Sequence, residues 1–154
     1  MSIYLVQHGK SLSKDQDPQK GISDQGKEDS IRIAQVAKMY KINVSRILHS
    51  GKKRAEQTAM IFHEYLEPEK AIGKQDGIAP MDDVKIFAQN LKTKSDIMYV
   101  GHLPFMEKLV SYLATGSEEY IVFKFQNSGI VCMEQHTGDI TGWNIKWALM
   151  PRID

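Results

Sequence analysis

The stretch Ile3-Tyr4-Leu5-Val6-Gln7-His8-Gly9 has the form of a buried strand that ends in a polar turn, and Ile97-Met98-Tyr99-Val100-Gly101-His102 repeats this form. Short apolar runs closed by a glycine are typical of strands in the middle of a sheet. Parallel α/β sheets bind their ligands where strands end and loops begin. We therefore expect His8 and His102 to meet at the carboxyl edge of such a sheet.

Strand-like and helix-like patterns alternate along the rest of the chain. They predict strands at 3–8, 44–50 and 96–101, and helices at 24–40, 52–66, 82–92 and 104–114. Ser23 is the expected cap of the first helix. Residues 9–22 form a long polar loop, and residues 67–80 are expected to be irregular. Three further strand-like runs follow at 120–125, 129–135 and 142–150, the last with Trp143 and Trp147 packing in the core or on a sheet face.

These patterns predict the α/β fold class. The expected architecture is a three-layer α/β/α sandwich with a mainly parallel sheet and an antiparallel edge. The length of 154 residues suits one domain covering 1–154.

Composition limits the classes of function. A net charge of +1 gives no support for binding nucleic acid or an anionic membrane. No apolar run approaches the ~20 residues of a membrane span, and the N-terminus lacks the order of a signal peptide. The single cysteine, Cys132, cannot form an internal disulfide, which favours the cytoplasm as the location.

The segment Ser50-Gly51-Lys52-Lys53-Arg54-Ala55-Glu56-Gln57-Thr58 adds basic groups at a third strand-to-helix junction. The planar guanidinium of Arg54 suits phosphate oxygens, and the start of a helix also favours an anion. A neutral His8 can attack phosphorus, and His102 can donate a further hydrogen bond. Gly9 and Gly101 allow the backbone to approach closely. Together these residues predict phosphate chemistry with a histidine nucleophile.

Two other patterns do not support a nucleotide-binding loop or a metal site. Gly51-Lys52 lacks the remainder of a G-x-x-x-x-G-K-[ST] loop, so nucleotide hydrolysis of that type is not supported. Two histidines without a converging carboxylate or cysteine pair make a poor metal site, and we predict no metal.

Three motifs resemble the histidine phosphatase superfamily, which has the phosphoglycerate-mutase-like fold. They are Leu5-Val6-Gln7-His8-Gly9, the run S-G-K-K-R-A-E-Q-T-A from Ser50 to Ala59, and Val100-Gly101-His102-Leu103-Pro104. The short chain and Lys20-Gly21-Ile22-Ser23 followed by Gly26 are similar to the SixA-type phosphohistidine phosphatase branch. The resemblance covers almost the whole chain.

The resemblance implies a role for each matching residue. His8 matches the histidine that is transiently phosphorylated, and Arg54 and His102 match members of the phosphate pocket. Lys20 falls where SixA-type proteins carry a phosphate-binding arginine, and Gln7 and Gly9 complete the implied pocket. The family uses no metal or organic cofactor for this step. The implied partners are a phosphorylated histidine-containing protein or a small phosphate ester, with inorganic phosphate as product.

One position departs from the family. The family signature is R-H-G, and this chain has Gln7-His8-Gly9. Gln7 can still donate two N–H hydrogen bonds, but it lacks the positive charge of the family arginine. A charge pair at ~4 Å is worth about 4 kcal/mol at an effective dielectric of 20. Lys10 follows directly and is a candidate for compensation.

No carboxylate clearly matches the acid that protonates an alkoxide leaving group in mutase-like relatives. Asp82 and Asp83 are the nearest candidates, and a place at a helix N-terminus explains them equally well. Imidazole, with a pKa near 6.5, leaves without such help, so a site lacking an acid favours a phosphoramidate. Two alternatives stay open: a general small phosphomonoesterase, and a phosphate-binding module whose catalysis is weakened by Gln7.

Overall fold

Six strands form one sheet in the computed structural model, which describes residues 2–91 and 96–153. The order is β3-β2-β4-β1-β5-β6. The strands are β1 (Ser2–Gln7), β2 (Arg46–His49), β3 (Gly73–Lys74), β4 (Ile97–Gly101), β5 (Ile130–Gln135) and β6 (Trp143–Leu149). The first four in this order run parallel, while β5 is antiparallel to β1 and β6 to β5. The predicted parallel sheet with an antiparallel edge is confirmed.

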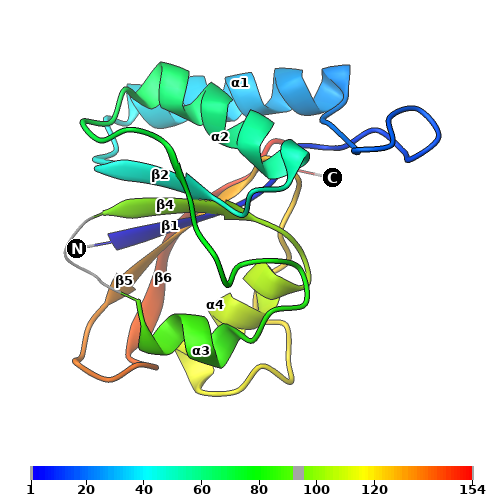
Figure 1. Ribbon diagram of the computed structural model, residues 1–154. Coiled ribbons are helices and arrows are strands. Elements are labelled where there is room, and N and C mark those ends of the chain that lie inside the picture. Colours follow the sequence, from blue (N-terminus) through cyan, green and yellow to red (C-terminus); the bar gives the residue numbers. More distant parts are fainter. Residues whose placement is uncertain (1, 92–95, 154) are drawn as a thin grey trace.

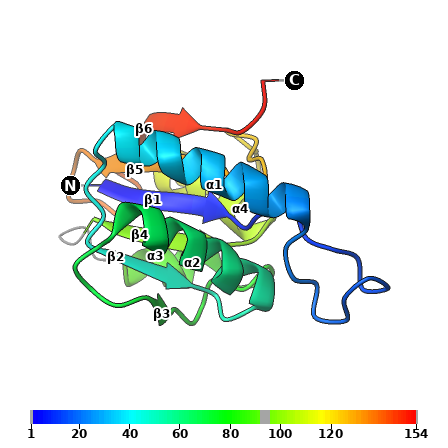
Figure 2. The ribbon, with the colours of Figure 1, turned by 90° about the horizontal axis from the view of Figure 1, so that it is seen from above.

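Helices cover both faces of the sheet (Figures 1 and 2). The helices α1 (Asp24–Met39) and α2 (Lys53–Leu66) lie on one face, and α3 (Val84–Gln89) and α4 (Phe105–Thr115) on the other. Successive residues of β1 therefore enter two different cores: Leu5 packs with Leu109 on the α4 side, and Val6 with Phe62 on the α2 side. A strand covered on both faces reads as a continuous apolar run, as β1 does. Among the described helices, none is long and apolar enough to cross a membrane.

The strand predicted at 120–125 is wrong. Residues in this run bond to α4 instead of to a neighbouring strand. The Phe125 N–H donates to the buried carboxylate of Glu107 at 2.9 Å, and the Ser111 hydroxyl donates to the Tyr120 carbonyl. Phe123 and Phe125 pack on the α4-side core, whereas Tyr120, Ile121 and Val122 are exposed, so only part of this apolar run covers a helix.

Two other boundaries differ from the prediction. The two-residue strand β3 lies inside the 67–80 segment that was expected to be irregular, where Gly73 pairs with Leu48 of β2. The helix predicted at 82–92 is shorter, because Asp83 caps it by accepting from the Lys85 N–H and α3 ends at Gln89. Lys92 lies outside the described residues.

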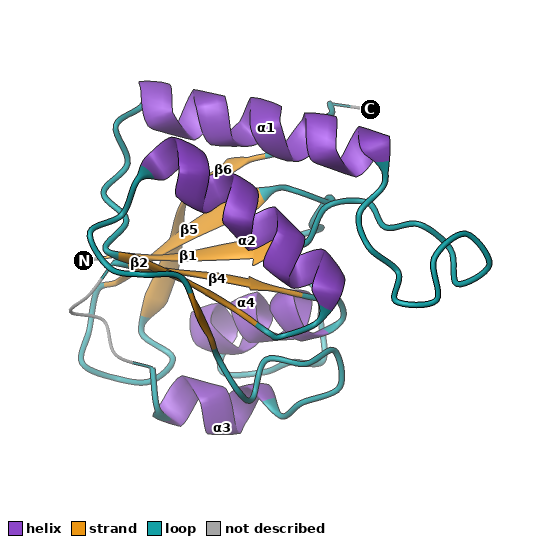
Figure 3. Ribbon diagram, turned by 45° about the horizontal axis from the view of Figure 1, so that its top comes forward, coloured by secondary structure: helices purple, strands orange, loops and turns teal. Residues whose placement is uncertain are grey.

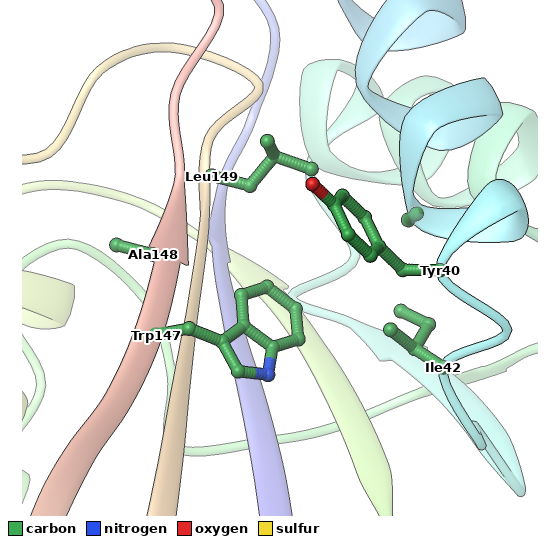
Figure 4. Close-up of a pocket in the computed structure, with 6 residues that line it drawn as sticks. Tyr40, Ile42, Trp147, Ala148 and Leu149 are labelled. Atoms are coloured by element: carbon green, nitrogen blue, oxygen red, sulfur yellow. The ribbon is translucent and has the colours of Figure 1, made fainter.

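A β-bulge separates the two tryptophans of β6. A shift in register falls between Cys132 and Met133 of β5, which changes the face presented by the facing strand. Trp143 thereby joins the α4-side core, and Trp147 packs on the other core with its ring centroid 6.0 Å from that of Tyr4. Trp147 also faces Tyr40 across an apolar cavity of about 430 Å³ between the end of α1 and β6 (Figure 4).

The loop between β1 and α1 is an ordered arm that extends beyond the end of the sheet (Figure 3). Its two sides pair, since the Leu12 N–H donates to the Gly21 carbonyl at 2.8 Å. The arm is tied to α2 by an ion pair of 2.9 Å between Asp17 and Lys53. This hydrogen-bonded lysine lowers the pKa of Asp17 to about 2. Lys20 is thus held near the start of α2.

The contact between α1 and this loop depends on Gly26. A Cβ at this position would lie 2.3 Å from the Lys10 carbonyl oxygen and 2.8 Å from the Lys10 nitrogen. We expect Gly26→Ala to lower the free energy of unfolding in urea by about 1–3 kcal/mol, because the backbone must shift. Gly138→Ala is the control, since its Cβ would meet nothing within 4 Å. Helix propensity alone would stabilise Gly26→Ala by about 1 kcal/mol, so a more stable variant would contradict this packing argument.

Candidate active site

Three neighbouring strands, β2, β4 and β1, deliver the central side chains. Ser50 follows β2, His102 follows β4 and His8 follows β1. The ladder continues past the strand ends, because the His8 N–H donates to the Gly101 carbonyl at 3.0 Å and the Ser50 N–H to Val100 at 3.2 Å. The rings of His8 and His102 consequently lie with centroids 5.1 Å apart.

The hydrogen bonds of His8 define its tautomer. Nδ1 lies 2.7 Å from the Gly9 carbonyl oxygen, which can only accept, so Nδ1 carries the proton. Nε2 is then unprotonated, and its lone pair accepts from the Nε–H of Arg54 at 3.3 Å. Burial lowers the pKa of His8 to about 4, and the charges of Arg54 and Lys20 act in the same direction, against the hydrogen bond to Gly9. His8 is therefore neutral at pH 7.

His102 is almost completely buried and is held by Ser50. Its Nε2 lies 2.6 Å from the Ser50 hydroxyl oxygen, which also accepts from the Lys52 N–H at 3.3 Å. The single hydroxyl proton of Ser50 can then be donated to Nε2, which leaves the ring proton on Nδ1. Nδ1 is buried and has no hydrogen-bond partner in the structure. Burial lowers the pKa of His102 to about 3, assisted by the charges of His8, Arg54 and Lys52.

The first turn of α2 supplies positive charge and free donors. Arg54 is the second residue of this helix, and Lys52 at the N-cap makes no side-chain capping bond. The first N–H groups of a helix have no partner within it, so they are available to an anion. The sequence pointed to Arg54 but assigned no role to Ser50 or Lys52, although both stand in the quoted basic segment.

A second set of polar groups fixes the turn that holds His8. The Thr58 hydroxyl accepts from the Gly9 N–H at 2.8 Å and donates to the Arg54 carbonyl at 2.8 Å, which joins the two turns. The Asn127 side chain donates to the His8 carbonyl at 2.9 Å. Gly9 packs so closely that a Cβ would lie 2.9 Å from the Ser30 hydroxyl oxygen. Sequence reasoning singled out Gly9 for its close packing but gave no role to Thr58, Asn127 or Ser30.

Gln7 and Lys10 line a cavity of about 470 Å³ whose walls include neither His8 nor His102, and no hydrogen bond joins the Gln7 amide to either histidine. Asp82 and Asp83 act as turn and helix caps, accepting from the N–H groups of Ala79 and Lys85 at 2.8 Å each.

The charges acting on the two histidines come from cationic groups. Within residues 2–91 and 96–153, the groups that shift the pKa of His8 and His102 by their charge are Arg54, Lys20, Lys52 and His8 itself. The described residues also contain no group of three His, Cys, Asp or Glu side chains that could hold a metal ion. The site is thus built to receive an anion.

Comparison with known proteins identifies the fold. No protein-family model and no curated protein matches the sequence. The solved structure of the protein histidine phosphatase SixA complexed with tungstate is 23% identical, with 98% of this chain and 97% of that chain covered and a TM-score of 0.84.

Two other similar structures have different substrates in their names. A phosphoserine phosphatase mutant from Entamoeba histolytica in complex with phosphoserine is 16% identical over 96% of this chain and 95% of that chain, with a TM-score of 0.72. A mycobacterial glucosyl-3-phosphoglycerate phosphatase in complex with VO3 is 10% identical over 95% and 97%, with a TM-score of 0.70. The predicted fold of the histidine phosphatase superfamily is confirmed, and it leaves the substrate open.

Proton titration tests the electrostatics of the site. We expect the ring signals of His8 and His102 in NMR spectra to titrate with midpoints of about 4 and about 3, assigned through His8→Asn and His102→Asn. Histidines of the unfolded chain titrate near pH 6.5, so below this pH the unfolded chain binds more protons than the folded protein does. The contribution of these two histidines to the free energy of unfolding is therefore fully present above pH 6.5 and is lost as the pH falls toward 4. A midpoint near 6.5 for either ring would refute the arrangement.

Proposed function

We propose that the protein is a phosphohistidine phosphatase that carries the phosphoryl group on His8. The observation that supports this most is the unprotonated Nε2 of His8, in a neutral ring beside Arg54. A nucleophile of this kind can form a covalent intermediate, which divides a difficult transfer into two easier steps. Similar structures are complexed with tungstate, VO3 or phosphoserine, which favours a phosphoryl ligand.

The first step moves the phosphoryl group to His8. The Nε2 lone pair attacks phosphorus, the P–N bond of the substrate breaks, and its electron pair stays on the departing imidazole nitrogen. Water then attacks phosphorus, the P–Nε2 bond breaks with its electron pair left on Nε2, and the inorganic phosphate departs with the protons of the water, which restores His8. Positioned donors stabilise the oxygens that carry the charge in both steps.

Named groups are available as those donors. Arg54 contacts the reacting nitrogen and can turn its guanidinium to the phosphoryl oxygens. The buried Nδ1 of His102 has no partner, and a phosphoryl oxygen would satisfy it. In line with the family resemblance we assign Lys20 and Gln7 to the same anion, together with the start of α2, while Gly9 supplies the adjoining turn, whose N–H donates to the Thr58 hydroxyl.

The absence of an acid bears on the substrate class. Among the described residues, Asp82 and Asp83 are engaged as caps, and no carboxylate shifts the pKa of His8 or His102. An alkoxide leaves poorly without a proton donor, whereas imidazole is a weak base that leaves readily. We therefore propose a phosphorylated histidine of a protein as substrate. Cys132 is buried and free, which suits the cytoplasm as the proposed location.

Phosphate release from two substrates tests this proposal. The purified protein is mixed with a phosphohistidine-bearing domain and, separately, with p-nitrophenyl phosphate. We expect release from the phosphohistidine to fall at least about a thousandfold in His8→Ala, because the nucleophile is lost. His136→Ala removes an exposed histidine and is the matched control.

The other outcomes select the alternatives. Faster His8-dependent turnover of alkyl phosphates than of phosphohistidine would indicate a general phosphomonoesterase. Binding of phosphate or vanadate without turnover of either substrate would indicate a phosphate-binding module.

A further inference from the structure

Asp17 holds together the arm between β1 and α1, which extends beyond the end of the sheet (Figure 3). Its carboxylate accepts from the N–H groups of Gln19 at 3.0 Å and Gly21 at 2.9 Å, and it pairs with Lys53 at 2.9 Å. Its backbone carbonyl accepts from the Lys20 N–H at 2.8 Å. Bonds to one aspartate therefore fix the chain at Lys20 and at the residues before and after it.

Lys20 has a backbone conformation that residues other than glycine rarely adopt. Its φ is +52°, in the left-handed region. A residue with a Cβ is strained there, and it keeps this conformation only where its surroundings impose it. The bonds to Asp17 supply this constraint, so the arm sets the direction in which the Lys20 side chain leaves the backbone.

The segment that follows Lys20 is docked on one face of α2. Lys53 and Gln57 are four residues apart in this helix, so their side chains share a face. Gln57 Oε1 accepts from the Ile22 N–H at 2.7 Å. Gly21 packs against both side chains, since a Cβ there would lie 3.0 Å from Gln57 Oε1 and from Lys53 Cε. The position of Lys20 is thus set relative to α2.

The same two turns of α2 hold the reactive histidine. Arg54 donates to His8 Nε2 at 3.3 Å, and the Thr58 hydroxyl accepts from the Gly9 N–H at 2.8 Å. One helix therefore presents Arg54 directly and also supports the arm that carries Lys20.

The ammonium group of Lys20 has no counter-charge in the protein. Within residues 2–91 and 96–153 no carboxylate forms an ion pair with it, whereas Lys53 is paired with Asp17. The charge of Lys20 contributes to the low pKa of His8, so this ammonium group lies near the ring. An unpaired cation at this place is available to phosphoryl oxygens.

We propose that Asp17 is a positioning residue for phosphoryl transfer. It fixes the left-handed turn at Lys20 and docks this turn on Lys53, so that the Lys20 ammonium meets the phosphoryl oxygens at His8. The inference rests on the proposed function and adds the group that aims the cation. A turn formed before the substrate arrives lowers the entropy that is lost when the lysine binds. Asp17 acts through Lys20 and does not itself touch the substrate.

A double-mutant cycle on Asp17 and Lys20 tests this assignment. The readouts are kcat/KM for phosphohistidine and the Kd of vanadate. We expect about a tenfold loss in Asp17→Asn and at least as large a loss in Lys20→Gln. The double variant is expected to be no worse than Lys20→Gln, because Asp17 then has no cation to position. Losses that multiply in the double variant, or no loss in Asp17→Asn, would overturn the inference. Asp15→Asn changes an exposed carboxylate of the same arm and is the matched control, with wild-type values expected.

The titration of His8 separates this inference from the proposed function, because it needs no substrate. We expect the NMR midpoint of His8 to rise from about 4 in Asp17→Asn, since a displaced Lys20 no longer disfavours the protonated ring. The double variant is expected to show no further rise beyond Lys20→Gln.

The direction of this shift is diagnostic. Asp17, with a pKa of about 2, is ionised throughout the titration, so loss of its charge alone would lower the midpoint of His8. An unchanged or lowered midpoint in Asp17→Asn overturns the positioning role. A raised midpoint in a protein without His8-dependent turnover supports the positioning role and counts against the proposed function.

Discussion

The hydrogen bond between His8 Nδ1 and the Gly9 carbonyl decides which atom of this site can react. It holds the proton on Nδ1 and leaves the lone pair on Nε2, where Arg54 lies within reach. The Gly9 turn is itself fixed by the Thr58 hydroxyl, which also bonds to the carbonyl of Arg54. Thr58 therefore couples the turn of the nucleophile to the helix start that carries Arg54. A reactive geometry of this kind has to be held by its supporting contacts.

The electrostatics of the site favour the binding of an anion. Burial and nearby cations lower the pKa of both histidines, so the rings are neutral. A phosphoryl group would relieve the repulsion among these cations and satisfy the unpartnered Nδ1 of His102. The same field keeps the nucleophile unprotonated before substrate arrives. One arrangement thus explains both the binding and the readiness of His8.

Part of this structure was predictable from local sequence, and part was not. The two strand-and-glycine patterns led to the histidine pair because parallel strands expose their carboxyl ends at one edge, and Arg54 followed from its place at a helix start. The run 120–125 misled because only its phenylalanines are packed, on the α4-side core instead of on a neighbouring strand, while its other apolar side chains are exposed. The faces of Trp143 and Trp147 depend on a bulge that no local pattern marks. Ser50, Thr58 and Asn127 act through contacts across long stretches of chain. The cavity at Gln7 exists only because the C-terminal segment folds back onto it.

The central claim is that His8 Nε2 receives the phosphoryl group. Rapid quenching of a reaction with excess phosphohistidine substrate into alkali, followed by mass spectrometry of peptides, measures this directly. The account predicts an acid-labile phosphoryl group on His8 that forms before steady state and decays when substrate is exhausted. Phosphate release in which His8 is never labelled, or in which another residue carries the label, would contradict it.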